Sequence, residues 1–419
     1  MRGRLALVAA VTLVVLAVAV VGGRPAPTRP APQQVGPDTP APALPSPDAP
    51  ARWAGVNWTR LEDPALDDRG VRFGGVRTDG SRIVAWGEKD AEDGVGPPGS
   101  RAISIVWTSA DGRAWRRQEA RLPGGEPFRL GYVNVSPAGF AALGGSGGPT
   151  QMATSVDGGE WRVFSAPVEP PGPVFPSAGG LVTVGFGPGA PVVYVSRDGS
   201  EWRAIHGPAQ PGRYSISDVA RTADGLVIAG SFGAQGNWDG LLWRWSASGG
   251  LVDVGSLAPA FVGPARSVSL YHAVPHAGGM YLQGSVDVAV PGECAALDGP
   301  VAALGPPIAD VCGRTDLVWT SSDWVRWQER EDTLPLMSPD TLVAGVDGLV
   351  AMLDSAPGGE NRGDDPSVWT SRDGIEWRRL ADGITAGHGL ALVALPDRLI
   401  AFAPDPGVET GFVVWVGTP

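Results

Sequence analysis

The sequence predicts an all-β fold, a seven-bladed β-propeller, and three observations lead to this prediction. A short phrase returns along the chain at intervals of roughly 40–50 residues, a spacing typical of propeller blades. Around each copy, short apolar runs alternate with turns that contain Gly or Asp, as in strands joined by hairpins. The two ends of the repeating region also carry complementary fragments of one blade.

The repeated phrase reads as a strand, a tight turn and a second strand. Its clearest copies are Val106–Trp115 and Val368–Trp377. The Asp carboxylate can accept backbone N–H bonds within the turn, and the Gly tolerates a positive φ. The Trp is large enough to fill the wedge between neighbouring blades. The residues to which we assign this structural role are Ser109, Asp111, Gly112, Trp115, Asp157, Trp161, Asp198, Trp202, Asp323, Trp327, Asp373, Gly374 and Trp377.

This phrase resembles the Asp-box, also called the BNR repeat, of sialidases, sortilin-type ectodomains and related propellers. The usual pattern is S-x-D-x-G-x-x-W, and the copies here lack the residue between Asp and Gly. The resemblance covers roughly residues 103–380 and implies a β-propeller. It does not imply one activity, because the box lies on the blade rim of enzymes and non-enzymes alike.

Each blade is expected to have four strands. A second pair of apolar runs joined by a Gly or Asp turn, such as Val219–Gly230, precedes each copy of the phrase. Two strands upstream and two around the phrase then make one blade. One copy, Ser246–Gly249, is worn. Counting it gives seven blades, and six is the alternative if this copy does not belong to a complete blade.

The two ends of the repeating region predict how the ring closes. After Leu390–Ala403 the chain forms one more strand, Gly411–Val416. Near the start of the globular region, Gly55–Leu61 matches Gly374–Leu380, the outer strand that follows a copy of the phrase. We expect the N-terminal strand to complete the last blade, because closure removes the free edges that an open sheet would leave.

The N-terminal region predicts export. Two arginines precede an unbroken apolar run, Leu5–Val21, whose length suits a short membrane span or a long signal peptide. We expect residues 1–23 to anchor the protein at the outer face of the cytoplasmic membrane, or residues 1–19 to be cleaved and the protein secreted. Residues 24–50 contain ten prolines and form a stiff linker. The propeller then spans residues 51–419.

Composition and net charge indicate the kind of organism and exclude one class of partner. The Ala/Gly/Pro-rich composition with Arg favoured over Lys is typical of high-GC bacteria, so we expect an exported actinobacterial protein. The two cysteines, Cys294 and Cys312, would then form a disulfide. The net charge is −12, so no basic surface predicts nucleic-acid binding. We expect a monomer.

A candidate binding face follows from three long loops, 88–102, 287–314 and 355–366, expected opposite the turns of the repeated phrase. Loops on a rigid scaffold commonly carry binding residues, and two of these loops are acidic. The alternatives are solvated surface loops or a cation site, although the carboxylates do not have EF-hand spacing. The candidate binding residues are Glu88, Asp90, Glu92, Asp93, Glu360, Asp364 and Asp365.

The function predicted from these features is non-enzymatic binding of a protein or a glycan at the cell surface, with the membrane contacted through the N-terminal helix. No catalytic residue, metal ligand or cofactor is predicted. The alternative implied by the resemblance is a sialidase-like exo-glycoside hydrolase. That activity would need arginines and a Tyr–Glu pair at the channel mouth, and Pro127–Leu130 is the nearest text to the Phe-Arg-Ile-Pro signature of sialidases.

Overall fold

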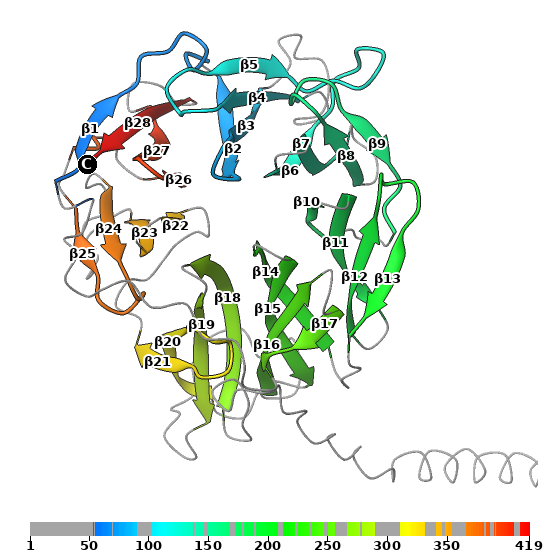
Figure 1. Cartoon of the computed structure of the whole chain (residues 1–419), viewed down its shortest axis with the longest axis vertical. Coiled ribbons are helices and arrows are strands. Elements are labelled where there is room, and N and C mark those ends of the chain that lie inside the picture. Colours follow the sequence, from blue (N-terminus) through cyan, green and yellow to red (C-terminus); the bar gives the residue numbers. More distant parts are fainter. Residues whose placement is uncertain are drawn as a thin grey trace, which may run out of the picture. The chain divides into compact units, whose positions relative to one another are not determined.

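Seven antiparallel sheets of four strands each form a ring, and the protein is a seven-bladed β-propeller (Figure 1). The computed structural model describes residues 53, 55–68, 70–89, 102–136, 139–145, 150–167, 172–177, 180–187, 190–207, 213–222, 225–234, 237–246, 250–255, 266–276, 279–289, 311–331, 341–345, 348–353, 366–380, 383–385, 389, 391–405 and 411–419. The predicted anchor and linker lie outside these residues. No helix in the described part of the chain is long and apolar enough to cross a membrane.

In each of the first six blades, four consecutive strands run from the inner to the outer edge. Blade 1 comprises β2 (Val71–Thr78), β3 (Ile83–Lys89), β4 (Ile103–Ser109) and β5 (Arg116–Glu119). Blade 2 comprises β6 (Leu130–Ser136), β7 (Gly139–Gly144), β8 (Gln151–Ser155) and β9 (Arg162–Phe164). Blade 3 comprises β10 (Val174–Ser177), β11 (Gly180–Gly187), β12 (Ala190–Ser196) and β13 (Arg203–His206).

The next three blades follow the same order. Blade 4 comprises β14 (Arg213–Arg221), β15 (Gly225–Ala234), β16 (Asn237–Ser246) and β17 (Gly250–Asp253). Blade 5 comprises β18 (Arg266–His276), β19 (Gly279–Ala289), β20 (Val311–Ser321) and β21 (Gln328–Glu331). Blade 6 comprises β22 (Leu342–Gly345), β23 (Gly348–Leu353), β24 (Ser367–Ser371) and β25 (Arg378–Arg379). The worn copy of the phrase therefore belongs to a complete blade, and the six-bladed alternative is wrong.

Blade 7 joins the two ends of the propeller. It comprises β26 (Ala391–Leu395), β27 (Arg398–Pro404), β28 (Phe412–Thr418) and, as its outer strand, β1 (Asn57–Arg60). β1 pairs antiparallel with β28, with Trp58 opposite Gly417 and Arg60 opposite Trp415. The predicted closure is confirmed, and Figure 1 shows β1 (blue) beside β28 (red).

Burial explains the sequence pattern of the strands. A central strand has a neighbouring blade on both faces, so it reads as a continuous apolar run: Ile83–Trp86 and Leu399–Ala403 are buried throughout. Outer strands face water, and Arg116, Arg378 and Arg379 are exposed. The described residues form seven apolar clusters between the blades, one at each seam between neighbours. Stability therefore depends on how well each seam is filled.

Candidate functional site

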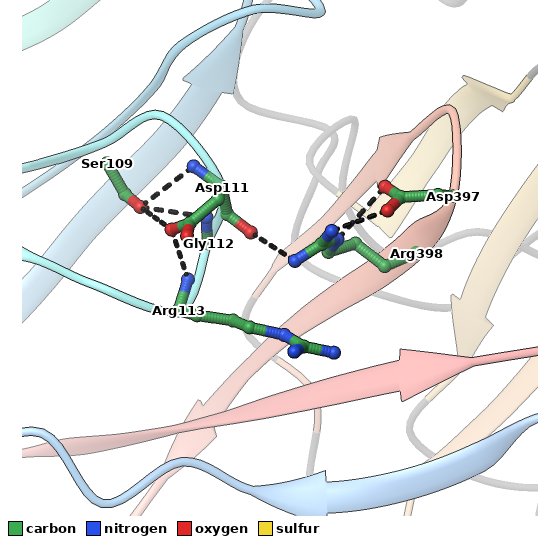
Figure 2. Close-up of polar contacts among 6 residues, drawn as sticks. All are labelled: Ser109, Asp111, Gly112, Arg113, Asp397 and Arg398. Atoms are coloured by element: carbon green, nitrogen blue, oxygen red, sulfur yellow. Dashed lines mark hydrogen bonds and ion pairs between the residues drawn. The ribbon is translucent and has the colours of Figure 1, made fainter.

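The repeated phrase forms a turn that satisfies its own polar groups. In blade 1, Ser109 Oγ accepts a hydrogen bond from the Gly112 N–H at 2.8 Å. Asp111 Oδ1 accepts a bond from the Arg113 N–H at 2.8 Å (Figure 2). It accepts a second bond from the Ala114 N–H at 3.0 Å. Asp111 and Ser109 thus replace water as partners of backbone donors that the tight turn leaves unpaired.

The same bonds recur in four other blades, and we call these five segments the Ser–Asp turns. The serine accepts from the residue three positions on at 2.8–2.9 Å in every copy. The aspartate accepts from the residue two positions on at 2.8–3.0 Å. The five Ser–Asp turns are Ser109–Trp115, Ser155–Trp161, Ser196–Trp202, Ser321–Trp327 and Ser371–Trp377.

These bonds lower the pKa of the turn aspartates. For Asp111, the N–H groups of Ala114 and Arg113 stabilise the charged form and hold the pKa below its usual value. For Asp323, burial raises the pKa, but bonds from the N–H and guanidinium of Arg326 outweigh burial and lower the pKa to about 2. The aspartates therefore cap the backbone of the turns in their ionised form.

The glycine of the turn is required by close contact with the preceding blade. Gly112 has φ +68°, and a Cβ there would lie 1.7 Å from Ile400 Cδ1 in blade 7. The neighbouring turn of blade 7 also holds the Ser–Asp turn, because Arg398 Nη1 donates to the Asp111 carbonyl at 3.1 Å (Figure 2). In blade 5, Trp324 occupies the glycine position with φ 64°, and the Arg244 guanidinium of blade 4 lies over its ring.

The tryptophan of each turn packs into the seam with the preceding blade. Trp161 of blade 2 is fully buried with Val84, Trp86 and Val106 of blade 1. Its indole N–H donates to the Gly158 carbonyl at 2.9 Å. Trp58 fills the seam between blades 6 and 7, where it packs with Val350 of blade 6. It belongs to β1, the N-terminal strand of the propeller. The tryptophans at six seams are Trp58, Trp115, Trp161, Trp202, Trp327 and Trp377.

Blade 4 breaks the pattern at the seventh seam, between blades 3 and 4. In blade 7, Leu399, Gly417 and Trp58 stand side by side across three strands. The corresponding three paired residues of blade 4 are Leu226, Trp245 and Leu251. Trp245 therefore occupies the serine position, which moves the worn copy one residue from its predicted alignment. A leucine, Leu251, occupies the position of the sealing tryptophan.

A groove of about 940 Å³ lies at this seam, and we call it the blade 3–4 groove. Its apolar lining comes from both blades: Phe175, Leu181, Val195, Trp202, Leu226 and Trp245. Its exposed charged lining comprises Arg197, Asp198, Glu201, Arg203 and Arg221. The sequence patterns do not predict this site, and the worn copy of the phrase is their one sign of it.

The predicted acidic binding face lies almost wholly outside the described residues. Of its candidates only Glu88 is described, at the end of β3. Its carboxylate accepts hydrogen bonds from Arg129 Nε at 2.6 Å and Arg72 Nη2 at 2.9 Å. Burial raises the pKa of Glu88, but these arginines outweigh burial and lower it. Glu88 thus links blades 1 and 2, and the binding role of the acidic loops stays a prediction.

The central channel contains a hollow of about 300 Å³ lined by the inner strands of all seven blades. Most lining residues are Val, Ala or Leu, but Arg77 Nη2 donates to Tyr132 Oη at 3.3 Å. Asp218 Oδ2 accepts from the Ala273 N–H at 2.9 Å. No glutamate is among the described residues that line it. The Tyr–Glu pair that a sialidase-like hydrolase needs is therefore not found in the described channel.

Two further expectations concern the cysteines and metal ions. Cys294 lies outside the described residues, so the disulfide with Cys312 stays a prediction. Within the described ranges, no group of three or more His, Cys, Asp or Glu side chains is placed to hold a metal ion.

No protein-family model matches the chain, and no curated protein matches its sequence. Solved structures do match. The polysaccharide lyase Uly1 is 11% identical, with a TM-score of 0.50 over 84% of this chain and 90% of its own. A catalytically inactive virginiamycin B lyase from Staphylococcus aureus is 10% identical, with a TM-score of 0.47 over 87% and 99%. The propeller domain of the Trilobed protease from Pyrococcus furiosus is 10% identical, with a TM-score of 0.47 over 82% and 93%. At these identities the likeness shows the propeller fold alone.

Proposed function

We propose that this chain is an extracytoplasmic β-propeller, tethered to the outer face of the cytoplasmic membrane, that binds a protein or a glycan at the cell surface without catalysing a reaction. The observation that carries this proposal is the blade 3–4 groove. Its volume lies within the roughly 300–1,000 Å³ of ligand pockets, and its lining combines aromatic and charged groups. It also occurs at the seam where the repeat departs from its sealing pattern.

The repeats themselves are, in this proposal, Asp-boxes of an exported actinobacterial protein. The shared hydrogen bonds of the five Ser–Asp turns support the first part, because serine, aspartate and tryptophan have the same partners in several blades. Composition supports the second part. The role of the turns is to build and seal the ring, and binding is assigned to the surface that the ring presents.

Tethering rests on the apolar run Leu5–Val21 and the proline-rich linker of residues 24–50. At about 3.1 Å per residue, this linker reaches roughly 80 Å. Protease added to intact cells should cleave the linker and release a fragment of residues 51–419. A chain that resists protease until the cells are lysed would contradict the proposed location.

Binding is tested with the full chain in detergent and two single variants of β17. Leu251→Trp places an indole directly opposite Trp245, which lines the groove. Val252→Trp places one at the next position, which is 46% exposed and on the opposite face of the strand. Immobilised wild type and Val252→Trp should retain a saturably bound envelope protein or glycan, and Leu251→Trp should not.

The same experiment separates binding from hydrolysis. A retained glycan should elute with its length unchanged. Release of shorter products or of terminal sugars would support the hydrolase alternative instead. Equal retention by wild type and Leu251→Trp would remove the groove as the binding site.

A further inference from the structure

The residues that line the central channel are not evenly distributed around the ring. Blade 3 contributes Phe175 and Pro176 to the wall of the hollow of about 300 Å³. The charged and hydrogen-bonding side chains come from blades 1, 2, 4 and 5. Among the described residues, blades 6 and 7 contribute only aliphatic side chains: Leu342, Val343, Ala344, Leu392, Val393 and Ala394. The channel therefore has one continuous apolar side and a polar wall around much of the rest.

Four inner strands are locally distorted where they supply the polar groups. The pairing of β2, β6, β14 and β18 with the next strand shifts register by one residue. Tyr132, Asp218 and His272 each directly follow the extra residue. The described pairings of the aliphatic strands β22 and β26 show no such shift. Because a β-bulge redirects a side chain and is common beside active sites, these distortions favour a binding role for the polar wall.

Two guanidinium groups lie against β6 of blade 2. Arg77 Nη2 of β2 donates to Tyr132 Oη at 3.3 Å, and Arg77 Cζ lies 5.1 Å from the centre of the same ring. Arg221 of β14 donates from Nη1 to the Val135 carbonyl at 3.4 Å. Blade 2 thus carries the positive side of the channel, although the chain as a whole has a net charge of −12.

The carboxylate of the channel wall lies against a different blade. Asp218 Oδ2 accepts a hydrogen bond from the Ala273 N–H of blade 5 at 2.9 Å, and His272 of the same strand also lines the hollow. A carboxylate can accept several hydrogen bonds at once. In a ring of seven, blades 2 and 5 are as far apart as two blades can be, and Figure 1 shows β6 and β18 on opposite sides of the ring. The channel therefore presents opposite charges across its width.

We propose that the central channel binds a small zwitterion with an apolar body, such as a short apolar peptide with free ends. Its carboxylate pairs with Arg77 and Arg221, its ammonium group pairs with Asp218, and its apolar side chains pack on blades 6 and 7. An anion is repelled by Asp218 and a cation by the two arginines, whereas a zwitterion is attracted to both sides. A few polar groups that fix orientation within an otherwise apolar wall are typical of small-molecule sites.

The probe is leucyl-leucine, titrated by calorimetry into the full chain in detergent. We expect one peptide to bind per chain. N-acetyl-leucyl-leucine lacks the ammonium group and leucyl-leucine amide lacks the carboxylate, so each should bind at least about tenfold more weakly. Glycyl-glycine keeps both charges without the apolar side chains and should also bind more weakly. Leucine distinguishes an amino acid from a peptide as the ligand, and binding of either supports the zwitterion site.

Two variants assign the ends of the ligand to the two sides of the channel. Asp218→Asn should weaken binding of leucyl-leucine and leave that of the acetylated peptide unchanged. Arg77→Gln should weaken binding of leucyl-leucine and leave that of the amide unchanged. Each pair forms a cycle that isolates one contact. Ala344→Trp, at an exposed channel position of blade 6, should block binding of leucyl-leucine by filling the apolar side.

Matched controls separate these effects from misfolding. Glu376→Gln and Arg378→Gln each remove one exposed charge of blade 6 away from the hollow and should bind like wild type. Equal affinity of the wild type for leucyl-leucine and its acetylated form, or equal losses in Arg378→Gln and Arg77→Gln, would overturn the proposal. The site goes beyond the proposed function, because Leu251→Trp at the blade 3–4 groove should leave leucyl-leucine binding intact. Failure of the channel site is therefore distinguishable from failure of the groove.

Discussion

Two seams of the same ring show what the repeated phrase does. Between blades 1 and 2, Trp161 is fully buried, its indole N–H is paired, and Asp157 meets Arg116. Between blades 3 and 4, Leu251 stands at the tryptophan position, and a groove of about 940 Å³ remains. Trp245, which is 6% exposed, packs in the apolar cluster of that seam together with Leu251. The comparison teaches that a blade keeps its four strands when its turn tryptophan is replaced, and that the seam with this replacement carries a hollow of ligand-binding size.

The largest effect should come from removing the seal supplied by the N-terminus. Deletion of residues 51–62 removes β1 and two buried tryptophans, Trp53 and Trp58, and leaves the edge of β28 unpaired. At about 3–5 kcal/mol for each buried tryptophan, the loss should approach the whole stability of the domain. Size-exclusion chromatography should show aggregates. A monomeric deletion variant with an unchanged melting temperature would argue against closure.

Alanine substitutions at the two compared seams should lower the free energy of unfolding by different amounts. Trp161→Ala should lower the free energy of unfolding by about 3–5 kcal/mol, because it empties a fully buried site. Leu251→Ala should lower it by only about 1 kcal/mol, because this side chain is half-buried beside an existing groove. Urea unfolding of both variants measures the difference. Equal losses would mean that the blade 3–4 seam is as tightly packed as its counterpart.

The turn aspartates should make the protein less stable as the pH falls below 4. The pKa of Asp323 is about 2 in the folded protein and near 3.8 without its partners. Its contribution is therefore complete above pH 4 and lost as the pH falls towards 2. Asp323→Asn should cost about 1 kcal/mol at neutral pH, because solvent screens this partly exposed group, and should flatten the acid limb. Thermal melts from pH 5 to pH 2 test this, with Glu376→Gln at an exposed carboxylate as control. An acid limb unchanged by Asp323→Asn would contradict the capping role.

The smallest effect should come from filling the groove. Leu251→Trp restores the residue type found at six seams and should raise the free energy of unfolding by about 0.5–1.5 kcal/mol. Val252→Trp, on the exposed face of the same strand, should change it by less than about 0.5 kcal/mol. Chemical denaturation of the two variants gives the comparison. Destabilisation by Leu251→Trp alone would show that the groove does not accept an indole in the orientation seen at the other seams.

Much of the fold follows from local chemistry. The Ser–Asp turn satisfies its own backbone donors within seven residues, so Ser109 to Trp115 already contains the reasons for its shape. Alternating apolar runs define four strands per blade, and the match between Gly55–Leu61 and Gly374–Leu380 predicts the closing strand because both are outer strands of the same repeat. These features depend on short-range hydrogen bonds and on residue size, which a sequence displays directly.

The candidate site could not be predicted in the same way, because a seam belongs to two blades at once. Trp161 packs on Val106, and Arg116 meets Asp157. Arg203 has no such partner in the part of the chain that the structure describes. These are relations between blades that the ring geometry brings together. The sequence by itself determined the repeat, its strands and its closure. Only the tertiary structure decided which seam carries a groove, because packing depends on what the neighbouring blade presents and not on the repeat alone.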